Sequence, residues 1–380
     1  MTATDSPVHP HFVMSRAAEA LYAYGRETAY DDIASAADAL RTGRHHMLVG
    51  ALPFDTSKPA ALTVPATVER GQPQEFYGTM PNIRVTQQIP EPSEHLRRVT
   101  EAVEVLRDTA SGLSKVVLAR VLEMQADTPV DALVLTHRLI RNDPDANSFC
   151  VDLSPAGDRF RGHTMVGCSP ELLVERRGDM VICHPFAGSA PRSSDPSLDR
   201  RTGEDLAGSH KNRHEHSVVI DQLREDLASL CVDVQVPPEP TLSRTAALWH
   251  LSTSISARLR QSSTTALDLA VALHPTPAVC GTPTEAAANL IARIEGDRGF
   301  YAGAVGWCDS SGDGRWAVSI RCAELSADGT AIRAYAGGGL VAESDPQDEL
   351  SETTVKFRTI LAGLGAELDE PLGRRESNSE

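Results

Sequence analysis

Three consecutive glycines, Gly337 to Gly339, constrain this chain more than any other stretch, because they end a strand-like run and precede a helix start. Without Cβ atoms they let a bound group approach the backbone N–H donors closely. Asp345-Pro346 predicts a helix with Pro at its first position, and Glu349 and Glu352 then share one face of it. The stretch predicts an anion cradle beside a cation site. It also fits a loop followed by a solvated acidic first turn.

Composition sets the broad class of the protein. The chain has 380 residues, 41% of them hydrophobic, and a net charge of −16. Such a chain can bury a core for one large or two ordinary domains, and its charge disfavours nucleic acid or an anionic membrane as partner. Seven scattered cysteines without a C-x-x-C pair are typical of reduced core thiols. No signal peptide pattern is present, and no apolar run approaches the roughly 20 residues needed to cross a bilayer, so we expect a cytoplasmic protein.

Local patterns predict a mixture of strands and helices. Residues 1–90 suggest strands joined by irregular loops, and the apolar spacing from Ser93 to Leu106 predicts a helix capped by Ser93. The run from Lys115 to Leu122 predicts a buried strand, and Ser311 to Gly314 a hairpin turn. Further elements are expected as helices over about 131–141, 199–231, 283–295 and up to 364, and as strands near 148–153, 163–168, 249–255, 300–307 and 315–323.

Two ionisable residues adjoin buried strands. Lys115 could act as a base if burial or nearby cations lowered its pKa, or it could extend its ammonium to water as most strand-end lysines do. Glu171 lies between a turn and an apolar strand, where most glutamates are solvated. The residue patterns leave both alternatives open.

A charged helical stretch carries candidate metal ligands. His210 and His214 are four residues apart, a spacing that can hold zinc, but the H-E-x-x-H pattern and a third ligand are missing. We therefore expect solvated histidines. Glu215, together with Glu349 and Glu352, would make an oxygen-rich site suited to magnesium.

Three further features are candidates for contacts with a ligand. Arg321 lies in an apolar run that predicts a strand, and a buried arginine needs a protein acid or a ligand carboxylate. The run from Thr282 to Glu285 predicts a capping box, whose helix N-terminus next to Gly281 offers an anion site. His250 in its apolar run is more typical of a satisfied core histidine.

In chain order, these motifs resemble those of the chorismate-utilising enzymes, and most closely the isochorismate synthases. The resemblance covers about residues 90 to 362. The motifs that carry it are Lys115 to Arg120, Ser169 to Leu173, Pro185 to Ser189, Arg213 to His216, His250-Leu251, Gly281 to Pro283, Tyr301 to Gly303, Ile320 to Cys322, Ala336 to Val341 and Glu352-Thr353.

The resemblance implies an α+β fold: two lobes of large, mostly antiparallel sheets packed together, with helices on the outside. Residues 1–90 would be the variable N-terminal part of the same fold, 91–364 the chorismate-binding catalytic domain, and 365–380 a disordered tail.

The activity implied is magnesium-dependent conversion of chorismate to isochorismate. Water adds to the ring carbon beside the carboxylated one, and the hydroxyl across the ring leaves. Lys115 matches the family's general base for water and Glu171 its general acid for the hydroxyl. Glu215 and Glu352 match its direct magnesium ligands, with Glu349 acting through water. At Asn212, where relatives often have an acid, this chain departs from the pattern.

The resemblance also implies a substrate site. Tyr301, Arg321 and the amides of Gly337 to Gly339 match positions that hold the enolpyruvyl carboxylate, and His250 matches one that lines the ring. The remaining substrate-binding positions that the resemblance implies are Gly188, Ser189, Gly281, Thr282 and Lys356.

Within the family, Lys115 and Ala187 favour water over ammonia as nucleophile. Anthranilate-forming relatives lack the lysine, and aminodeoxychorismate-forming ones often carry a lysine at the position of Ala187. We therefore expect no glutamine amidotransferase subunit, and the resemblance to isochorismate synthases, which are commonly monomers, implies a monomer. Salicylate synthases, which go on to eliminate pyruvate, are the nearest alternative, followed by a non-catalytic chorismate-binding homologue. Neighbouring enzymes decide whether isochorismate enters siderophore, menaquinone or salicylate synthesis.

Overall fold

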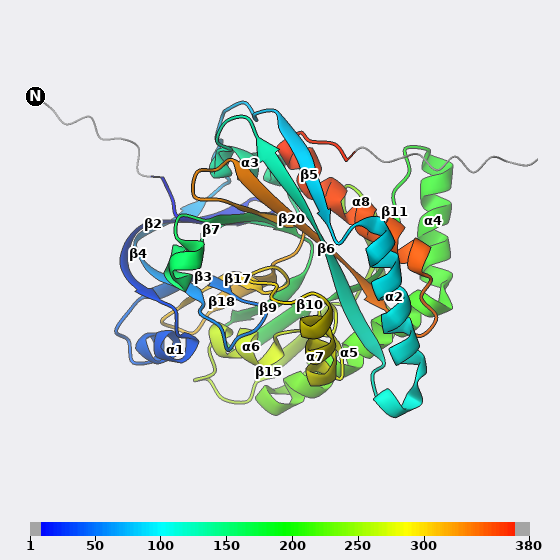
Figure 1. The fold of residues 1–380 in the computed structure, drawn as a ribbon. Coiled ribbons are helices and arrows are strands. Elements are labelled where there is room, and N and C mark those ends of the chain that lie inside the picture. Colours follow the sequence, from blue (N-terminus) through cyan, green and yellow to red (C-terminus); the bar gives the residue numbers. More distant parts are fainter. Residues whose placement is uncertain (1–8, 369–380) are drawn as a thin grey trace, which may run out of the picture.

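The computed structural model describes residues 9–368, and antiparallel strands organise them (Figure 1). The strands are β1 (Phe12–Arg16), β2 (Glu19–Tyr30), β3 (Met47–Leu52), β4 (Ala61–Gly71), β5 (Ile83–Ile89), β6 (Lys115–Ala126), β7 (Asn147–Asp152), β8 (Thr164–Ser169), β9 (Leu172–Arg177), β10 (Met180–His184), β11 (Phe186–Pro191), β12 (Cys231–Gln235), β13 (Thr241–Arg244), β14 (Leu248–Ser252), β15 (Ile255–Leu259), β16 (Gly281–Thr282), β17 (Ala304–Asp309), β18 (Gly314–Val318), β19 (Cys322–Leu325) and β20 (Ala331–Leu340).

Eight α-helices accompany the strands in the described residues. They are α1 (Ile33–Arg41), α2 (Pro92–Arg107), α3 (Ala132–Asn142), α4 (Pro196–Gly208), α5 (His210–Leu230), α6 (Ala266–Leu273), α7 (Thr284–Ile294) and α8 (Pro346–Leu364). Short 3₁₀ turns occupy Thr109–Ser111, Ser154–Ala156 and Asp158–Phe160.

Strand pairing forms one continuous antiparallel path. It runs β5-β6-β20-β19-β8-β7-β1-β2-β4-β3-β17-β18-β9-β10-β15-β12, and β16 adds to the start of β6. The long strands β2 and β4 join the two halves of this path. The expected α+β fold with large antiparallel sheets is confirmed.

Alternating side chains give the sheet two apolar faces. In β1, Phe12 and Met14 join a core cluster that also contains side chains of β3, β9, β17 and β18, whereas Val13 packs in a second cluster with α3 and α8. In β2, Leu21 belongs to the first cluster and Tyr22 to the second. The period of two residues in a strand explains this division. One sheet therefore separates two cores.

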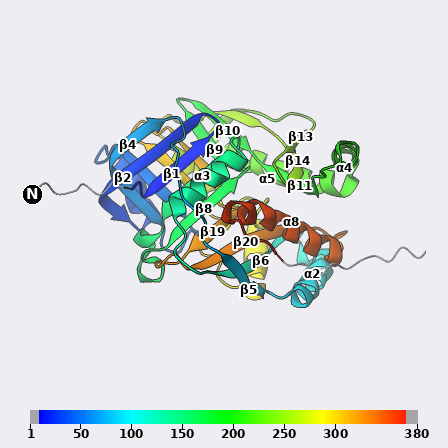
Figure 2. The same ribbon diagram turned by 90° about the horizontal axis from the view of Figure 1, so that it is seen from above.

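Helices cover the outside of the sheet, and a small second sheet stands beside it. Figure 2 shows α4 and α5 next to the three-stranded sheet β11-β14-β13, with α8 lying between that sheet and β20. Helix α8 contacts both β20 and β11. This arrangement brings α5, α8, β11, β14 and β20 around a common space.

Several expected elements are confirmed: the strand from Lys115, the helix over about 131–141, the hairpin between β17 and β18, and the helix that begins after Asp345. Asp345 caps α8 by accepting hydrogen bonds from the N–H groups of Gln347 and Asp348. Each of these elements was predicted from residues within or next to the element itself.

Other expectations about local structure were wrong. Helix α2 begins at Pro92 and not behind a Ser93 cap, and the helix expected over 199–231 is two helices, because Ser209 caps a new one. The expected capping box at Thr282 is absent: Thr282 pairs with Lys115 in β16, and α7 starts after Pro283 without a side-chain cap. Pairing with β6 outweighed the local capping pattern.

The C-terminal segment, the cysteines and the apolar character of the helices can each be compared with the sequence-based expectations. Of the expected tail, 369–380 lie outside the described residues, whereas Gly365 ends α8 in the left-handed conformation and Ala366 is buried. All seven cysteines are buried and unpaired. No helix within residues 9–368 combines the length and the apolar character that crossing a bilayer requires.

Candidate active site

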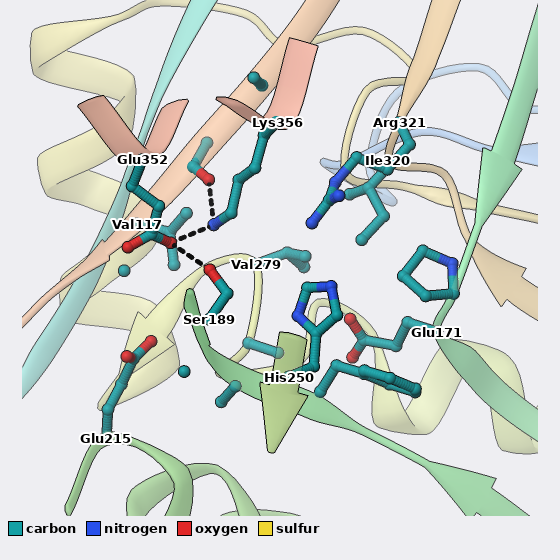
Figure 3. A pocket seen from close by; sticks show the side chains of 18 of the residues that line it. Val117, Glu171, Ser189, Glu215, His250, Val279, Ile320, Arg321, Glu352 and Lys356 are labelled. Atoms are coloured by element: carbon teal, nitrogen blue, oxygen red, sulfur yellow. Dashed lines mark hydrogen bonds and ion pairs between the residues drawn. The ribbon is translucent and has the colours of Figure 1, made fainter. Parts of the chain in front are cut away.

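A cavity lies where β20, α8, β11 and β14 meet the loops before β9 and β19 (Figure 3). Its walls include many of the residues singled out above. Those are Glu171, Gly188, Ser189, Glu215, His250, Tyr301, Arg321, Gly337, Gly339, Glu352 and Lys356. Residues that were not singled out also line it. They are Val117, Pro170, Phe186, Ala278, Val279, Ile320 and Ala336, and Ala187, which served above to compare water and ammonia as nucleophiles, lines it as well.

Glu171 occupies the tight turn between β8 and β9 and is only 2% exposed. Its backbone N–H donates to Ser169 Oγ, and its carbonyl accepts from the N–H of Val318, so the turn is held on both sides. Burial raises the pKa of its carboxyl to about 8, although the positive charges of Lys115 and Arg321 oppose this. Glu171 is therefore protonated at neutral pH and can donate a proton.

Lys115 begins β6 and is fully buried, so it does not extend its ammonium to water. Its Nζ lies 3.0 Å from Oε1 of Glu215 on α5, an ion-pair distance. A lysine that accepts a proton from water must first be neutral. The ion pair must therefore be broken before Lys115 can act as a base.

Arg321 was expected within a strand, and this was wrong. It lies in the break between β18 and β19 with φ of +52°, a left-handed conformation that costs a residue with a side chain about 1–3 kcal/mol. Its carbonyl accepts from the N–H of Cys168, which anchors the break. The side chain is buried, yet its Nη1 has no hydrogen-bond partner among residues 9–368. A buried guanidinium with a free donor favours an anionic ligand.

His250 and Tyr301 form apolar walls with polar tips. His250, on β14, is 3% exposed and its Nε2 has no partner in the described part of the chain. Burial, followed by the charges of Arg321 and Lys356, lowers the pKa of His250 well below its usual range, so the imidazole is neutral. Tyr301 stacks on Tyr335 with ring centroids 5.0 Å apart. Both side chains can contact the ring or side chain of a small ligand.

The glycine run divides between the two faces of β20. Gly337 and Gly339 line the cavity, and the Gly337 carbonyl accepts from Lys356 Nζ at 2.8 Å, so the polar groups of these two residues face away from β6. Gly338 does not line the cavity. A Cβ built there would stand 3.0 Å from Glu349 Oε2, and one on Gly339 would stand 2.3 Å from Glu215 Oε1. The missing side chains thus make room for carboxylates as well as for a ligand.

Gly281 and Thr282 lie beside the cavity without lining it. They pair with Val116 and Lys115, and a Cβ on Gly281 would stand 2.2 Å from the Lys115 carbonyl oxygen. Gly281 and Thr282 hold the start of β6 in place.

Ser189 on β11, another of the predicted substrate-binding residues, donates a hydrogen bond to Glu352 Oε1 at 3.1 Å.

Each of the three candidate magnesium ligands is paired with a lysine. The distances are 3.0 Å for Glu215 with Lys115, 2.9 Å for Glu349 with Lys211, and 2.5 Å for Glu352 with Lys356. In residues 9–368, no three His, Cys, Asp or Glu side chains are gathered closely enough to hold a metal ion.

The donor set nevertheless suits magnesium, which binds few carboxylates and keeps waters. Glu349 and Glu352 lie three residues apart on α8, and burial, followed by the charge of Glu352, raises the pKa of Glu349. Glu349 is 1% exposed and its Oε2 has no partner among the described residues. A buried carboxylate oxygen without a donor favours a cation.

The neighbouring residues of α5 have simpler surroundings. His210 and His214 are exposed, in line with solvated histidines. Asn212 Nδ2 donates to Ser209 Oγ at 2.8 Å, so the side-chain amide of Asn212 has its hydrogen-bond partner within the first turn of α5. Lys211, which sequence reasoning missed, lies four residues before Glu215, and that helical spacing was the available signal.

The model of the chorismate binding enzyme family matches residues 60–365. This chain belongs to the chorismate binding enzymes. It is 54% identical to a Mycobacterium tuberculosis protein with the provisional name isochorismate synthase MenF, over 97% of this chain and 100% of the relative. It is 42% identical to isochorismate synthase DhbC of Bacillus subtilis, over 87% of this chain and 85% of the relative.

A solved structure has the same fold. The crystal structure of Bacillus anthracis DhbC, provisionally named a 2,3-dihydroxybenzoate-specific isochorismate synthase, aligns with a TM-score of 0.87 and 37% identity. The alignment covers 96% of this chain and 98% of DhbC. The fold expected from the resemblance and the family membership are therefore confirmed.

Proposed function

We propose that this chorismate binding enzyme converts chorismate to isochorismate in a magnesium-dependent reaction. Its similarity to proteins named isochorismate synthases over nearly the whole chain supports this. The observation that carries the proposal is the buried carboxyl of Glu171, whose pKa burial raises, in a cavity shared with the buried guanidinium of Arg321, whose Nη1 has no partner among the described residues. The first supplies an acid for a leaving hydroxyl, and the second attracts a carboxylate.

The two groups of the acid–base pair have separate tasks. Lys115 takes a proton from water while the water oxygen bonds to the ring carbon beside the carboxylated one. The ring double bonds shift, and the bond to the hydroxyl across the ring breaks. Glu171 gives its proton to that hydroxyl, which leaves as water, because hydroxide is a poor leaving group. Proton exchange with solvent then restores both residues.

The remaining residues bind and orient the substrate. Arg321, Tyr301 and the backbone N–H groups of Gly337 and Gly339 would hold the enolpyruvyl carboxylate, and neutral His250 would line the ring. Glu215 and Glu352 would hold the magnesium ion directly, and Glu349 through water. When bound, this ion would hold the ring carboxylate and withdraw electron density from the conjugated system.

Product analysis tests the proposal. Purified protein is incubated with chorismate and magnesium, without ammonia or glutamine, and the products are separated by chromatography. We expect isochorismate, and the reaction should stop when a chelator removes the metal. Accumulation of salicylate and pyruvate would instead indicate a salicylate synthase. Absence of any turnover would leave a non-catalytic chorismate-binding protein.

A further inference from the structure

Of the three lysines paired with the carboxylate cluster of the candidate magnesium ligands, Lys356 lines the cavity, whereas Lys115 and Lys211 do not. Lys211 lies four residues before Glu215 on α5, and its side chain is 31% exposed. Its Nζ donates to Glu349 Oε1 at 2.9 Å, and Ser344 Oγ donates to the same oxygen at 2.8 Å. Lys211 is the most exposed of these three lysines.

The charges around Lys211 are those of the proposed metal ligands. Besides Glu349, the carboxylates of Glu352 and Glu215 lie close enough to raise the pKa of Lys211 against the effect of burial. One ammonium thus balances part of the repulsion among three carboxylates, of which Glu215 and Glu349 are buried. Positive charge near these carboxylates lowers the cost of keeping them ionised.

Only one of the two carboxylate oxygens of Glu349 accepts hydrogen bonds. Oε1 has two donors, whereas Oε2 has no partner in residues 9–368 although the side chain is 1% exposed. Gly338 leaves the room that this oxygen needs, because a Cβ there would stand 3.0 Å away. A cation that binds near Oε2 would share one carboxylate with the Lys211 ammonium, and two cations at one carboxylate repel each other.

We propose that Lys211 is a tethered counter-ion that holds the carboxylate cluster together before the divalent cation binds, and that it sets the cation affinity by competing for Glu349. The proposal rests on the magnesium site of the proposed function. Lys211 acts on the site through Glu349, so it is a positioning residue. It weakens metal binding and stabilises the metal-free protein.

Calorimetric titration of the chelator-treated protein with magnesium chloride tests this competition directly. Lys211→Met should lower the Kd for magnesium about tenfold, the change expected when one competing charge-assisted hydrogen bond of ordinary net strength is lost. The metal-free variant should unfold at a lower temperature than the wild type. Its gain in Tm on adding magnesium should be larger, because tighter binding stabilises the folded state more.

Two control variants isolate the contact from the charge. Arg213→Met removes the same charge from the same helix, but Arg213 pairs with Glu239 at the surface, so its magnesium Kd should equal that of the wild type. Lys211→Arg keeps the charge next to Glu349 and should keep the weaker, wild-type Kd.

The outcomes separate this proposal from the proposed function. An unchanged or higher Kd in Lys211→Met, while Glu352→Gln still abolishes magnesium binding, would overturn the role of Lys211 and leave the metal site intact. An equal decrease of Kd in Lys211→Met and Arg213→Met would reduce the effect to net charge and also overturn it. If the wild type gives no magnesium isotherm, both proposals fail.

Discussion

Replacing Glu171 with Gln should remove a large pH dependence of stability. The folded-state pKa of Glu171 is about 8 against an ordinary value of 4.5, so between these values the folded protein binds more protons at this group than the unfolded chain. Stability contributed by the neutral carboxyl is therefore fully present below pH 4.5 and decreases as the pH rises towards 8. From pH 5 to pH 9 the wild type should lose about 4 kcal/mol that Glu171→Gln does not lose.

Thermal unfolding of both metal-free proteins across this pH range measures the effect. With an unfolding entropy of about 2.1 cal/mol/K per residue, 4 kcal/mol corresponds to about 5 °C for a chain of 380 residues. We expect Tm of Glu171→Gln minus Tm of the wild type to rise by about that amount between pH 5 and pH 9. A difference that stays constant or falls with pH would refute the protonated state of Glu171.

The same variant tests the proposed role in turnover. An amide cannot donate the proton, so kcat should fall by about 10²- to 10⁴-fold. For the wild type, kcat should decline as the pH rises through about 8, because ionised Glu171 is no longer an acid. A rate that keeps increasing well above that pH would assign the acid to another group.

Three other substitutions test the rest of the site. Lys115→Ala should abolish turnover while the circular dichroism spectrum stays native, and near-normal rates would exclude Lys115 as the base. Glu352→Gln should raise the magnesium concentration needed for half-maximal rate, and an unchanged requirement would remove this residue from the metal site. Gly339→Ala should weaken magnesium binding, because its Cβ would stand 2.3 Å from Glu215 Oε1 and force that carboxylate to move. Gly71→Ala on β4, with no atom within 4 Å of its new Cβ, is the matched control and should bind magnesium as the wild type does.

The sequence predicted correctly those helices, strands and turns that depend on interactions between residues close together in the chain. The β-branched run after Lys115, the turn between β17 and β18, and the Asp345 cap each act within a few residues. The order of strands in the sheet could not be derived this way. It depends on pairings such as β1 with β7 and β3 with β17, between segments far apart in the chain.

The wrong expectations at Thr282 and Arg321 share one physical cause. At Thr282 a good capping sequence was present, but its backbone pairs with Lys115 instead. At Arg321 an apolar run suggested a continuous strand, but the chain turns there with a positive φ and presents the guanidinium to the cavity. In both places long-range contacts outweighed a local preference, and both places adjoin the candidate active site.

The glycine run shows how far a local pattern can predict a site. Its three glycines predicted close approach by some group, but not which group approaches each residue. In a strand, neighbouring residues face opposite sides, so the groups on the cavity face, Tyr301 Oη next to Gly337 and Glu215 Oε1 next to Gly339, would require glycine only at these two positions. Gly338 is needed because Glu349 packs against the other face of β20. Three consecutive glycines are therefore expected where a strand lies between a substrate cavity and a carboxylate of the proposed metal site.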